Sequence, residues 1–269
     1  MIDQTTLMQF LTTPETLENN LKNSKLLLVD TRSFSEYAKG HIPGAVNIDL
    51  FQFHWLDTSA PGIKHFERQA RILLSNIGVK KNQIVVFYDD ISGMSAARGV
   101  WLLLYFSHKN VSLLDGGFTR WTEEGLPVEN KSNPFVPSNF VGKPNRKVLA
   151  TLEAVKKSLG KKDSVIIDAR TKEEYTGEHK RAARAGHIPS SINVDWDQNL
   201  EGGSFKDLDR LSSLYSKIPK KSKIITYCQG GYRAANTFLA LKILGYTNVK
   251  MYLGSWAEWG NKSKLPIER

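Results

Sequence analysis

Residues 224–233 read Ile-Ile-Thr-Tyr-Cys-Gln-Gly-Gly-Tyr-Arg, and a stretch of helical composition follows over 234–244. The apolar run 224–227 predicts a buried strand, and the two glycines predict a tight loop between that strand and the helix. Backbone N–H groups in such a loop, together with the positive end of the helix, favour an anion. The stretch therefore predicts an α/β unit that activates Cys228, the one cysteine of the chain, as a thiolate.

A lone cysteine is also a common buried hydrophobic residue, so a purely structural role is the alternative. The glycines that follow Cys228 favour the functional interpretation, because a core strand has no use for glycine at that point. The predicted anion-binding loop comprises Gln229, Gly230, Gly231, Tyr232 and Arg233.

The chain repeats itself at a nearly constant shift of 138 residues. The repeated segments are Leu27-Leu28-Val29-Asp30-Thr31-Arg32 with Val165-Ile166-Ile167-Asp168-Ala169-Arg170, Gly40-His41-Ile42-Pro43 with Gly186-His187-Ile188-Pro189, Gly93 with Gly231, Asp115-Gly116-Gly117-Phe118 with Leu253-Gly254-Ser255-Trp256, and Trp121 with Trp259. This pattern predicts a tandem duplication of one domain.

Each half is predicted to be α/β with a mainly parallel sheet flanked by helices, because short apolar runs alternate with helical spacing. The expected strands are 26–29, 85–88, 165–167 and 224–227, and the expected helices begin near Thr13 or span 66–77, 96–105, 151–159, 208–215 and 234–244. Prolines in a polar stretch indicate a linker. The predicted organisation is a cysteine-free domain over 1–128, with a structural or regulatory role, a linker over 129–147 and a catalytic domain over 148–269.

The first half serves as an internal control for the second. When Gly93 is set on Gly231, Cys228 falls opposite Asp90, and a one-residue gap would place Asp89 there instead. Either alignment leaves the first half without a thiol, so thiolate chemistry is expected in the second half alone.

The second half also carries eight extra residues just before its Gly-His-Ile-Pro segment, within residues 177–185. This insertion contains Lys180, Arg181 and Arg184. We hypothesise that at least one of them, Arg184 first, reaches the Cys228 pocket and binds an anionic substrate. A solvated basic loop is the alternative.

Features that recur in both halves are weaker indicators of catalysis. Asp30 with Arg32, and Asp168 with Arg170, are therefore interpreted as structural ion pairs. His41 and His187 are interpreted as structural, hydrogen-bonded residues. Trp256 replaces Phe118 of the first half, so it is a candidate to line the pocket, although a core position is the alternative.

Composition excludes several classes. The 269 residues suit two domains, and no apolar run approaches the roughly 20 residues of a membrane span. The N-terminus lacks a signal pattern, so a cytoplasmic protein without membrane partner is expected. One cysteine excludes an internal disulfide and a multi-cysteine metal site. The net charge of +10 suits an anionic small substrate or acidic partner, whereas scattered lysines without interleaved aromatics argue against nucleic acid.

Taken together, these motifs resemble the tandem-domain rhodanese family of sulfurtransferases over essentially the whole chain. The resemblance rests on the Asp-x-Arg strand ends, the Gly-His-Ile-Pro turns, the single cysteine loop and the run Gly254-Ser255-Trp256-Ala257-Glu258-Trp259. It implies that the Cys228 thiolate takes sulfur from an anionic donor as a persulfide. The sulfur would then pass to cyanide, a small thiol or a thioredoxin-like acceptor, with no metal or nucleotide cofactor.

Loop length separates this activity from that of related phosphatases and arsenate reductases, which resemble the family but close a seven-residue loop. Here Cys228 to Arg233 is six residues, which favours sulfur over phosphate. Thiosulfate is the favoured donor, since Arg233 resembles thiosulfate-using bacterial members. The alternatives are 3-mercaptopyruvate, and a persulfide carrier for a protein partner with little small-donor turnover. A scaffold role for Arg233 also stays open.

Overall fold

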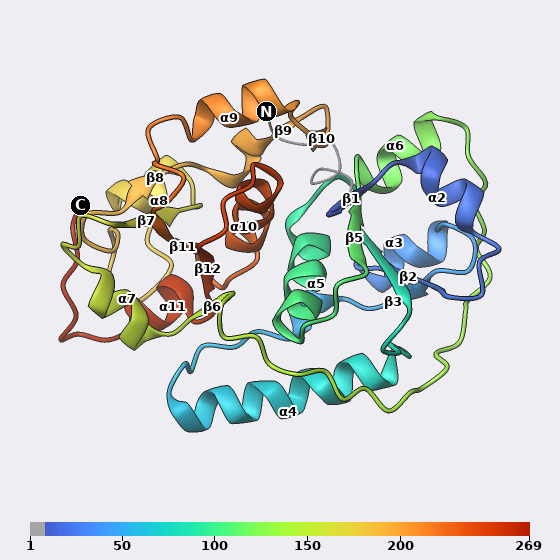
Figure 1. Ribbon diagram of the computed structural model, residues 1–269, viewed down its shortest axis with the longest axis horizontal. Helices are drawn as coiled ribbons and strands as arrows, with labels where there is room; N and C mark the ends of the chain where they lie inside the picture. Colours follow the sequence, from blue (N-terminus) through green and yellow to red (C-terminus); the bar gives the residue numbers. More distant parts are fainter. Residues whose placement is uncertain (1–8) are drawn as a thin grey trace. The chain divides into compact units, whose positions relative to one another are not determined.

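A computed structural model describes residues 9–269 of the protein (Figure 1). The described chain forms two compact units, each of which includes a short segment from the other half of the sequence. Unit 1 comprises Met1–Phe53, Phe66–Asn145 and Leu200–Phe205, and unit 2 comprises His54–His65, Arg146–Asn199 and Lys206–Arg269. The predicted domains, with boundaries at 128 and 148, are contiguous, whereas each compact unit includes one exchanged segment; residues 1–8 of the predicted first domain lie outside the described part.

Unit 1 is built on a five-stranded parallel sheet in the order β1-β5-β4-β2-β3. Its strands are β1 (Leu11–Thr12), β2 (Leu26–Asp30), β3 (Val46–Asn47), β4 (Ile84–Tyr88) and β5 (Val111–Leu114). Its helical elements are α2 (Pro14–Asn20), α3 (Phe34–Lys39), η1 (Leu50–Gln52), α5 (Met94–Tyr105) and α6 (Gly117–Glu123), together with most of α4 (Ala60–Asn76). The antiparallel pair β9 (Leu200–Glu201) and β10 (Ser204–Phe205) belongs to the same unit.

Unit 2 repeats this order as β6-β12-β11-β7-β8, again with parallel pairing. Its strands are β6 (Leu149–Ala150), β7 (Ser164–Asp168), β8 (Ile192–Asn193), β11 (Lys223–Tyr227) and β12 (Val249–Tyr252). Its helices are α7 (Leu152–Ser158), α8 (Lys172–Thr176), η2 (Trp196–Asn199), α9 (Leu208–Leu214), α10 (Arg233–Ile243) and α11 (Ser255–Trp259). The duplication and the predicted fold class are confirmed.

Alternate residues of β11 point to opposite faces of the unit 2 sheet, and helices pack on both faces. Ile225 and Tyr227 pack in a buried cluster with residues of α7 and α11. On the other face, the Thr226 hydroxyl donates to the carbonyl of Ala234 in α10 at 3.0 Å. This arrangement places the loop between β11 and α10 at the carboxyl edge of the sheet, where α/β proteins bind their ligands.

The helices begin where polar side chains bond the first free N–H groups. Thr13 caps α2, and Thr151 caps α7 at the equivalent position of the repeat. Thr171 forms a capping box with Glu174 at the start of α8. Such caps are each worth about 1 kcal/mol. No helix among residues 9–269 has the length and apolar character needed to cross a membrane.

Candidate active site

Cys228 follows β11 directly and is buried. Its sulfur accepts a hydrogen bond from the backbone N–H of Gly231 at 3.1 Å. Gly231 has φ +87°, in the left-handed region that favours glycine, and its N–H points toward the sulfur. The carbonyl of Cys228 accepts from the N–H of Trp256 at 2.9 Å, which ties the loop to α11.

The rest of the loop is held by close contacts within unit 2. A Cβ at Gly230 would lie 3.1 Å from Cδ2 of His54, and the His54 ring lies 5.0 Å from the ring of buried Tyr232. The Gln229 amide donates to the carbonyl of Arg181 at 2.9 Å. His54 and the insertion around Arg181 therefore both border the cysteine loop.

Arg233, the last residue of the loop, is buried against a carboxylate that the sequence did not single out. Its two terminal nitrogens donate to Glu174 at 2.5 and 3.0 Å, and Arg181 lies 3.7 Å from the same carboxylate. Burial opposes the charge of Arg233, but Glu174 and the charges of Cys228 and Asp195 raise its pKa. Burial likewise opposes the charge of Glu174, and Arg233 lowers its pKa. The charge of Arg233 is therefore within electrostatic reach of Cys228.

The equivalent loop of unit 1 contains Asp89 at the position of Cys228. Tyr88 pairs with Asp30, and Tyr227 pairs with Asp168, so the strand ends correspond at a shift of 139. The carbonyl of Asp89 accepts from the N–H of Phe118 at 2.8 Å, just as Cys228 accepts from α11. The alignment of Gly93 on Gly231, and hence of Asp90 on Cys228, is therefore wrong, and the gapped alternative is correct.

The Asp89 carboxylate occupies the cradle that its own loop forms. It accepts N–H bonds from Ile91, Gly93, Ser95 and Ala96 at 3.1 to 3.3 Å, at the N-terminus of α5. Burial raises the pKa of Asp89 to about 6, although these N–H groups oppose the shift. The repeat thus shows that this loop geometry gathers backbone donors around an anionic group.

The three cations of the insertion differ in their contacts. Arg184 donates all five of its N–H groups to backbone carbonyls at 2.6 to 3.3 Å, so its guanidinium serves the chain itself. These carbonyls belong to Trp259, Gly260, Lys262, Ser263 and Leu265. Arg181 borders the loop through Glu174, whereas Lys180 is exposed. That Arg184 comes first among the substrate contacts stays a prediction, although backbone carbonyls already engage its N–H groups.

Trp256 lies in the core. Its side chain is fully buried, and the guanidinium of Arg170 lies 4.6 Å from its ring centroid. Phe118 stands in the same relation to Arg32 in unit 1, at 3.9 Å. Trp256 thus occupies a core position, which was the alternative interpretation of this residue.

The recurring pairs have the structural roles predicted for them. Arg170 forms a buried ion pair with Asp168 at 2.5 Å, and Arg32 does so with Asp30 at 2.6 Å. His187 stacks on its neighbour in the fold, Tyr175, with ring centroids 3.7 Å apart, and its Nδ1 lies 2.8 Å from the Tyr175 carbonyl. His41 has the same arrangement in unit 1.

Three further polar residues of this region escaped the sequence analysis: His54, Glu174 and Asp195. Glu174 is signalled by the capping-box spacing from Thr171, but nothing local reveals its pairing with Arg233. His54 belongs to a segment of the first half that groups with unit 2, which the repeat does not indicate. No cluster of three or more His, Cys, Asp or Glu among the described residues is arranged to hold a metal ion.

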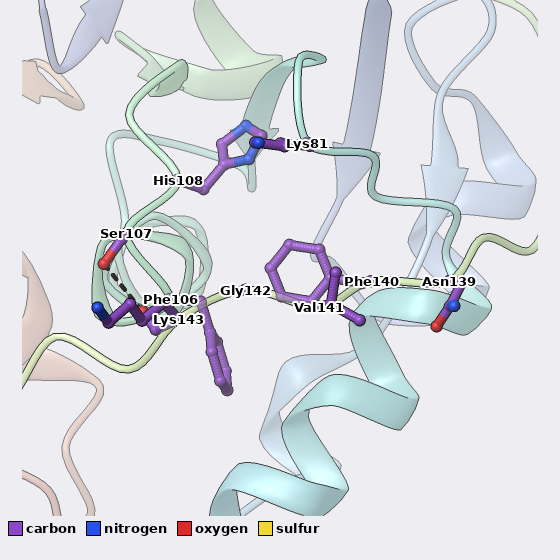
Figure 2. Close-up of a pocket in the computed structure, with 9 residues that line it drawn as sticks. All are labelled: Lys81, Phe106, Ser107, His108, Asn139, Phe140, Val141, Gly142 and Lys143. Carbon is purple, nitrogen blue, oxygen red and sulfur yellow. Dashed lines mark hydrogen bonds between the residues drawn. The ribbon is translucent and has the colours of Figure 1, made fainter.

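A pocket of about 360 Å³ lies in unit 1, at the amino edge of its sheet (Figure 2). His108 and Phe140 border it, but His108 Nε2 bonds the carbonyl of Gln83 at 3.0 Å. The Ser107 hydroxyl donates to the carbonyl of Lys143 at 2.8 Å, as Figure 2 shows. These polar groups serve the fold, and the pocket lies at the sheet edge opposite the Asp89 loop.

The sequence was compared with models of known protein families. The model described as "Rhodanese-like domain" matches residues 13–124 and 151–262. The chain belongs to the rhodanese family. A rhodanese relative from Pseudomonas aeruginosa, named "Thiosulfate sulfurtransferase", is 34% identical over 95% of both chains. One of the same name from Azotobacter vinelandii is also 34% identical over 95% of both. "Sulfur carrier protein TtuD" from Thermus thermophilus is 31% identical over 97% of both.

Solved structures agree with the fold. "Crystal structure of YnjE" has a TM-score of 0.84 at 24% identity and covers 97% of this chain and 68% of its own. "The wildtype structure of EanB" has a TM-score of 0.86 at 20% identity and covers 99% of this chain and 70% of its own. At these identities the likeness shows the rhodanese fold alone.

Proposed function

We propose that the protein is a thiosulfate sulfurtransferase that works through a persulfide on Cys228. The Cys228 thiolate attacks the outer sulfur of thiosulfate, the sulfur–sulfur bond of the donor breaks, and sulfite leaves with the bonding electrons. The persulfide is then discharged to cyanide or a thiol acceptor. The observation that carries this proposal is the paired loop geometry: Gly231 N–H on the Cys228 sulfur, and four N–H groups on the Asp89 carboxylate at the equivalent place.

In this proposal the loop from Gln229 to Arg233 is the anion-binding site. Its N–H groups stabilise the persulfide in a buried place where such bonds are strong. Arg233 contributes charge beside the sulfur while Glu174 fixes its direction, so it combines the charge and scaffold roles. Arg181 and the exposed Lys180 are the candidates to guide the donor, and Arg184 shapes the insertion that presents them.

Thiosulfate is favoured as donor because relatives of that name match nearly the whole chain. 3-Mercaptopyruvate is the second candidate, although the Arg184 guanidinium is bonded to backbone carbonyls and is not free to bind the carboxylate of this donor. A persulfide carrier is the third, and the relative named as a sulfur carrier favours it. We propose a structural or regulatory role for unit 1, whose loop has Asp89 in place of the thiol. A cytoplasmic location stays a prediction.

Paired steady-state assays test the donor. Thiosulfate and 3-mercaptopyruvate are supplied at equal concentration with cyanide as acceptor, and C228S serves as the blank. A kcat/KM at least about tenfold higher for thiosulfate, which is about 1.4 kcal/mol of transition-state preference, supports the proposal. A preference for 3-mercaptopyruvate overturns the donor, and stoichiometric loading without turnover supports the carrier instead.

A further inference from the structure

Two buried side-chain oxygens in residues 9–269 accept no hydrogen bond: Oδ1 of Asp195 and Oε1 of Gln229. Leaving a buried acceptor unpaired costs about 1–3 kcal/mol, so such groups call for an explanation. Gln229 directly follows the nucleophile Cys228. Asp195 follows β8, at the same carboxyl edge of the unit 2 sheet. Both unpaired oxygens therefore belong to the part of unit 2 that holds the sulfur.

The chain around Asp195 is held against neighbouring elements at this edge of the unit 2 sheet. The N–H of Val194 bonds the carbonyl of Asp168 at 3.0 Å, which extends the pairing of β8 with β7. η2, which begins just after Asp195, packs on α10, where the Asn199 amide donates to Asn236 at 3.0 Å. The Asp195 and Cys228 charges both act on Arg233, at the start of α10.

The charged groups that act on Asp195 leave it a base of moderate strength. Burial and the neighbouring Asp197 carboxylate raise the pKa of Asp195 to about 6, while Arg233 and the backbone N–H groups of Trp196 and Asp197 oppose the shift. Glu174 offsets the effect of Arg233, since it is bonded to that guanidinium. A carboxylate of this kind is ionised at neutral pH and suited to accept a proton there.

Neither small anion of the proposed reaction can satisfy the two unpaired oxygens. Thiosulfate and the cyanide ion carry lone pairs but no hydrogen, so they only accept hydrogen bonds. Asp195 Oδ1 and Gln229 Oε1 are themselves acceptors and require a donor. A thiol supplies an S–H group, and an amide-bearing thiol supplies N–H groups as well. The pair of oxygens thus fits the molecule that removes sulfur, rather than the one that delivers it.

We propose that the sulfur acceptor is a thiol whose proton passes to Asp195, an inference that rests on the proposed function. The carboxylate takes the S–H proton, and the resulting thiolate attacks the outer sulfur of the Cys228 persulfide. A sulfur–sulfur bond forms to the acceptor as the bond to the Cys228 sulfur breaks, and its electron pair stays on Cys228 as a thiolate. The proton then leaves Asp195 for the product persulfide or for water. Gln229 Oε1 accepts an N–H group of the acceptor.

Single-turnover measurements on the full chain separate the two half-reactions. Wild type, D195N and the control D209N, at an exposed aspartate of the same unit, are loaded with thiosulfate while sulfite release is followed. The loaded proteins are then discharged to reduced glutathione, or to cyanide at a pH where it is the anion. D195N should load and discharge to cyanide like the wild type, but discharge to glutathione at least about tenfold more slowly. D209N should match the wild type throughout.

The pH profile of the wild type supplies a readout that needs no variant. Discharge to glutathione should level off above the Asp195 pKa of about 6, whereas an unassisted thiol would keep gaining rate as it ionises. Glutathione discharge by D195N at the wild-type rate overturns the inference, and so does an equal loss with both acceptors, which indicates a structural role. If wild type fails to release sulfite from thiosulfate, the proposed function itself fails.

Discussion

At the scale of the residue, the two repeats place different side chains in one backbone setting. Asp89 fills its loop with its own carboxylate, while Cys228 offers a sulfur to the N–H of Gly231. A carboxylate already satisfied by four N–H groups has no capacity to accept a sulfur atom. In the proposed function, this difference between thiol and carboxylate restricts persulfide formation to unit 2.

The burial of Asp89 predicts a pH-dependent cost to stability. Its pKa in the folded protein, about 6, lies above the reference value of 3.8, so the folded state holds this proton more tightly than the unfolded state. The unfavourable contribution is absent at low pH, grows between these values and is complete above pH 6, at roughly 3 kcal/mol. D89N should therefore gain stability relative to wild type as pH rises from 5 to 7.

Urea unfolding at several pH values measures this difference, with E123Q as the control because the Glu123 side chain is exposed. The quantity compared is the free energy of unfolding of D89N minus that of the wild type at each pH. A pH-independent loss from the N–H bonds of the loop adds a constant to this difference and does not affect its change with pH. A D89N minus wild-type difference that stays flat across this pH range would contradict the account.

Glu174 predicts the opposite pH behaviour. Arg233 lowers the Glu174 pKa in the folded protein, so the contribution of the pair is present above the unfolded pKa and lost as pH falls through the folded value. E174Q leaves Arg233 buried without its partner, and we expect a loss of about 3–5 kcal/mol at neutral pH that shrinks in acid. Denaturant unfolding checks this, with exposed Glu173→Gln as the matched control. An equal effect of both substitutions would refute the pairing.

At the scale of the element, a short segment of the first half completes unit 2. Thr58 donates its N–H and hydroxyl to Glu258 at 3.0 and 2.6 Å, and accepts from the N–H of Leu152 at 2.8 Å. The Tyr252 hydroxyl donates to the same buried carboxylate at 2.8 Å. These bonds fix the segment that carries His54 to the loop at Gly230.

Thr58→Val tests this attachment, because valine keeps the shape and removes the hydroxyl. The Leu152 N–H and one oxygen of Glu258 would lose a partner in a buried place, at a cost of about 1–3 kcal/mol. T58S keeps the hydroxyl and should recover most of that loss. The urea midpoint reports both variants, and equal stability of T58V and T58S would show that the hydroxyl bonds contribute little.

Elements with strong local signals could be predicted from the sequence. The runs around Val85 and Ile225 form β4 and β11, and the cysteine loop lies between a strand and a helix as expected. The two-residue strands β3 and β8 and the short α11 carry too little pattern of their own, since tertiary pairing defines them. The sequence left the one-residue offset at Asp89 as an alternative, because the shift returns to 138 at Val111 and Val249, after α5 and α10.

The residues of the candidate site also differ in how far the sequence predicts them. Cys228 and its loop are set by adjacent residues, so the sequence predicts them. The roles of Arg184, Glu174 and Asp195 depend on groups far along the chain: Arg184 bonds carbonyls between Trp259 and Leu265, and Glu174 bonds Arg233. Residue spacing carries no information on partners so far along the chain. The sequence alone therefore does not distinguish the three cations of the insertion, whose contacts differ in the fold.

At the scale of the whole molecule, the net charge of +10 belongs entirely to the unit with the cysteine. Unit 2 contains 24 Lys and Arg against 13 Asp and Glu, whereas unit 1 contains 13 against 14. A basic unit raises the local concentration of anions, and salt screens this attraction. In the proposed function, the charge favours capture of the anionic thiosulfate rather than the chemical step.

We expect kcat/KM for thiosulfate to fall several-fold as ionic strength rises from about 0.01 to about 0.15 M, with kcat nearly constant. Steady-state rates at a series of salt concentrations measure this. Discharge of loaded protein to the neutral thiol 2-mercaptoethanol provides the control, because it lacks the long-range attraction. A kcat/KM independent of salt would show that the charge of unit 2 does not guide the donor.

The most direct test of the account is the intact mass of the protein after incubation with thiosulfate and removal of excess donor. We predict that the wild type gains the mass of one sulfur atom, that cyanide removes it with release of one equivalent of thiocyanate, and that C228S gains nothing. A wild type of unchanged mass, or a C228S variant that gains sulfur equally, would contradict the assignment of Cys228 as the persulfide carrier.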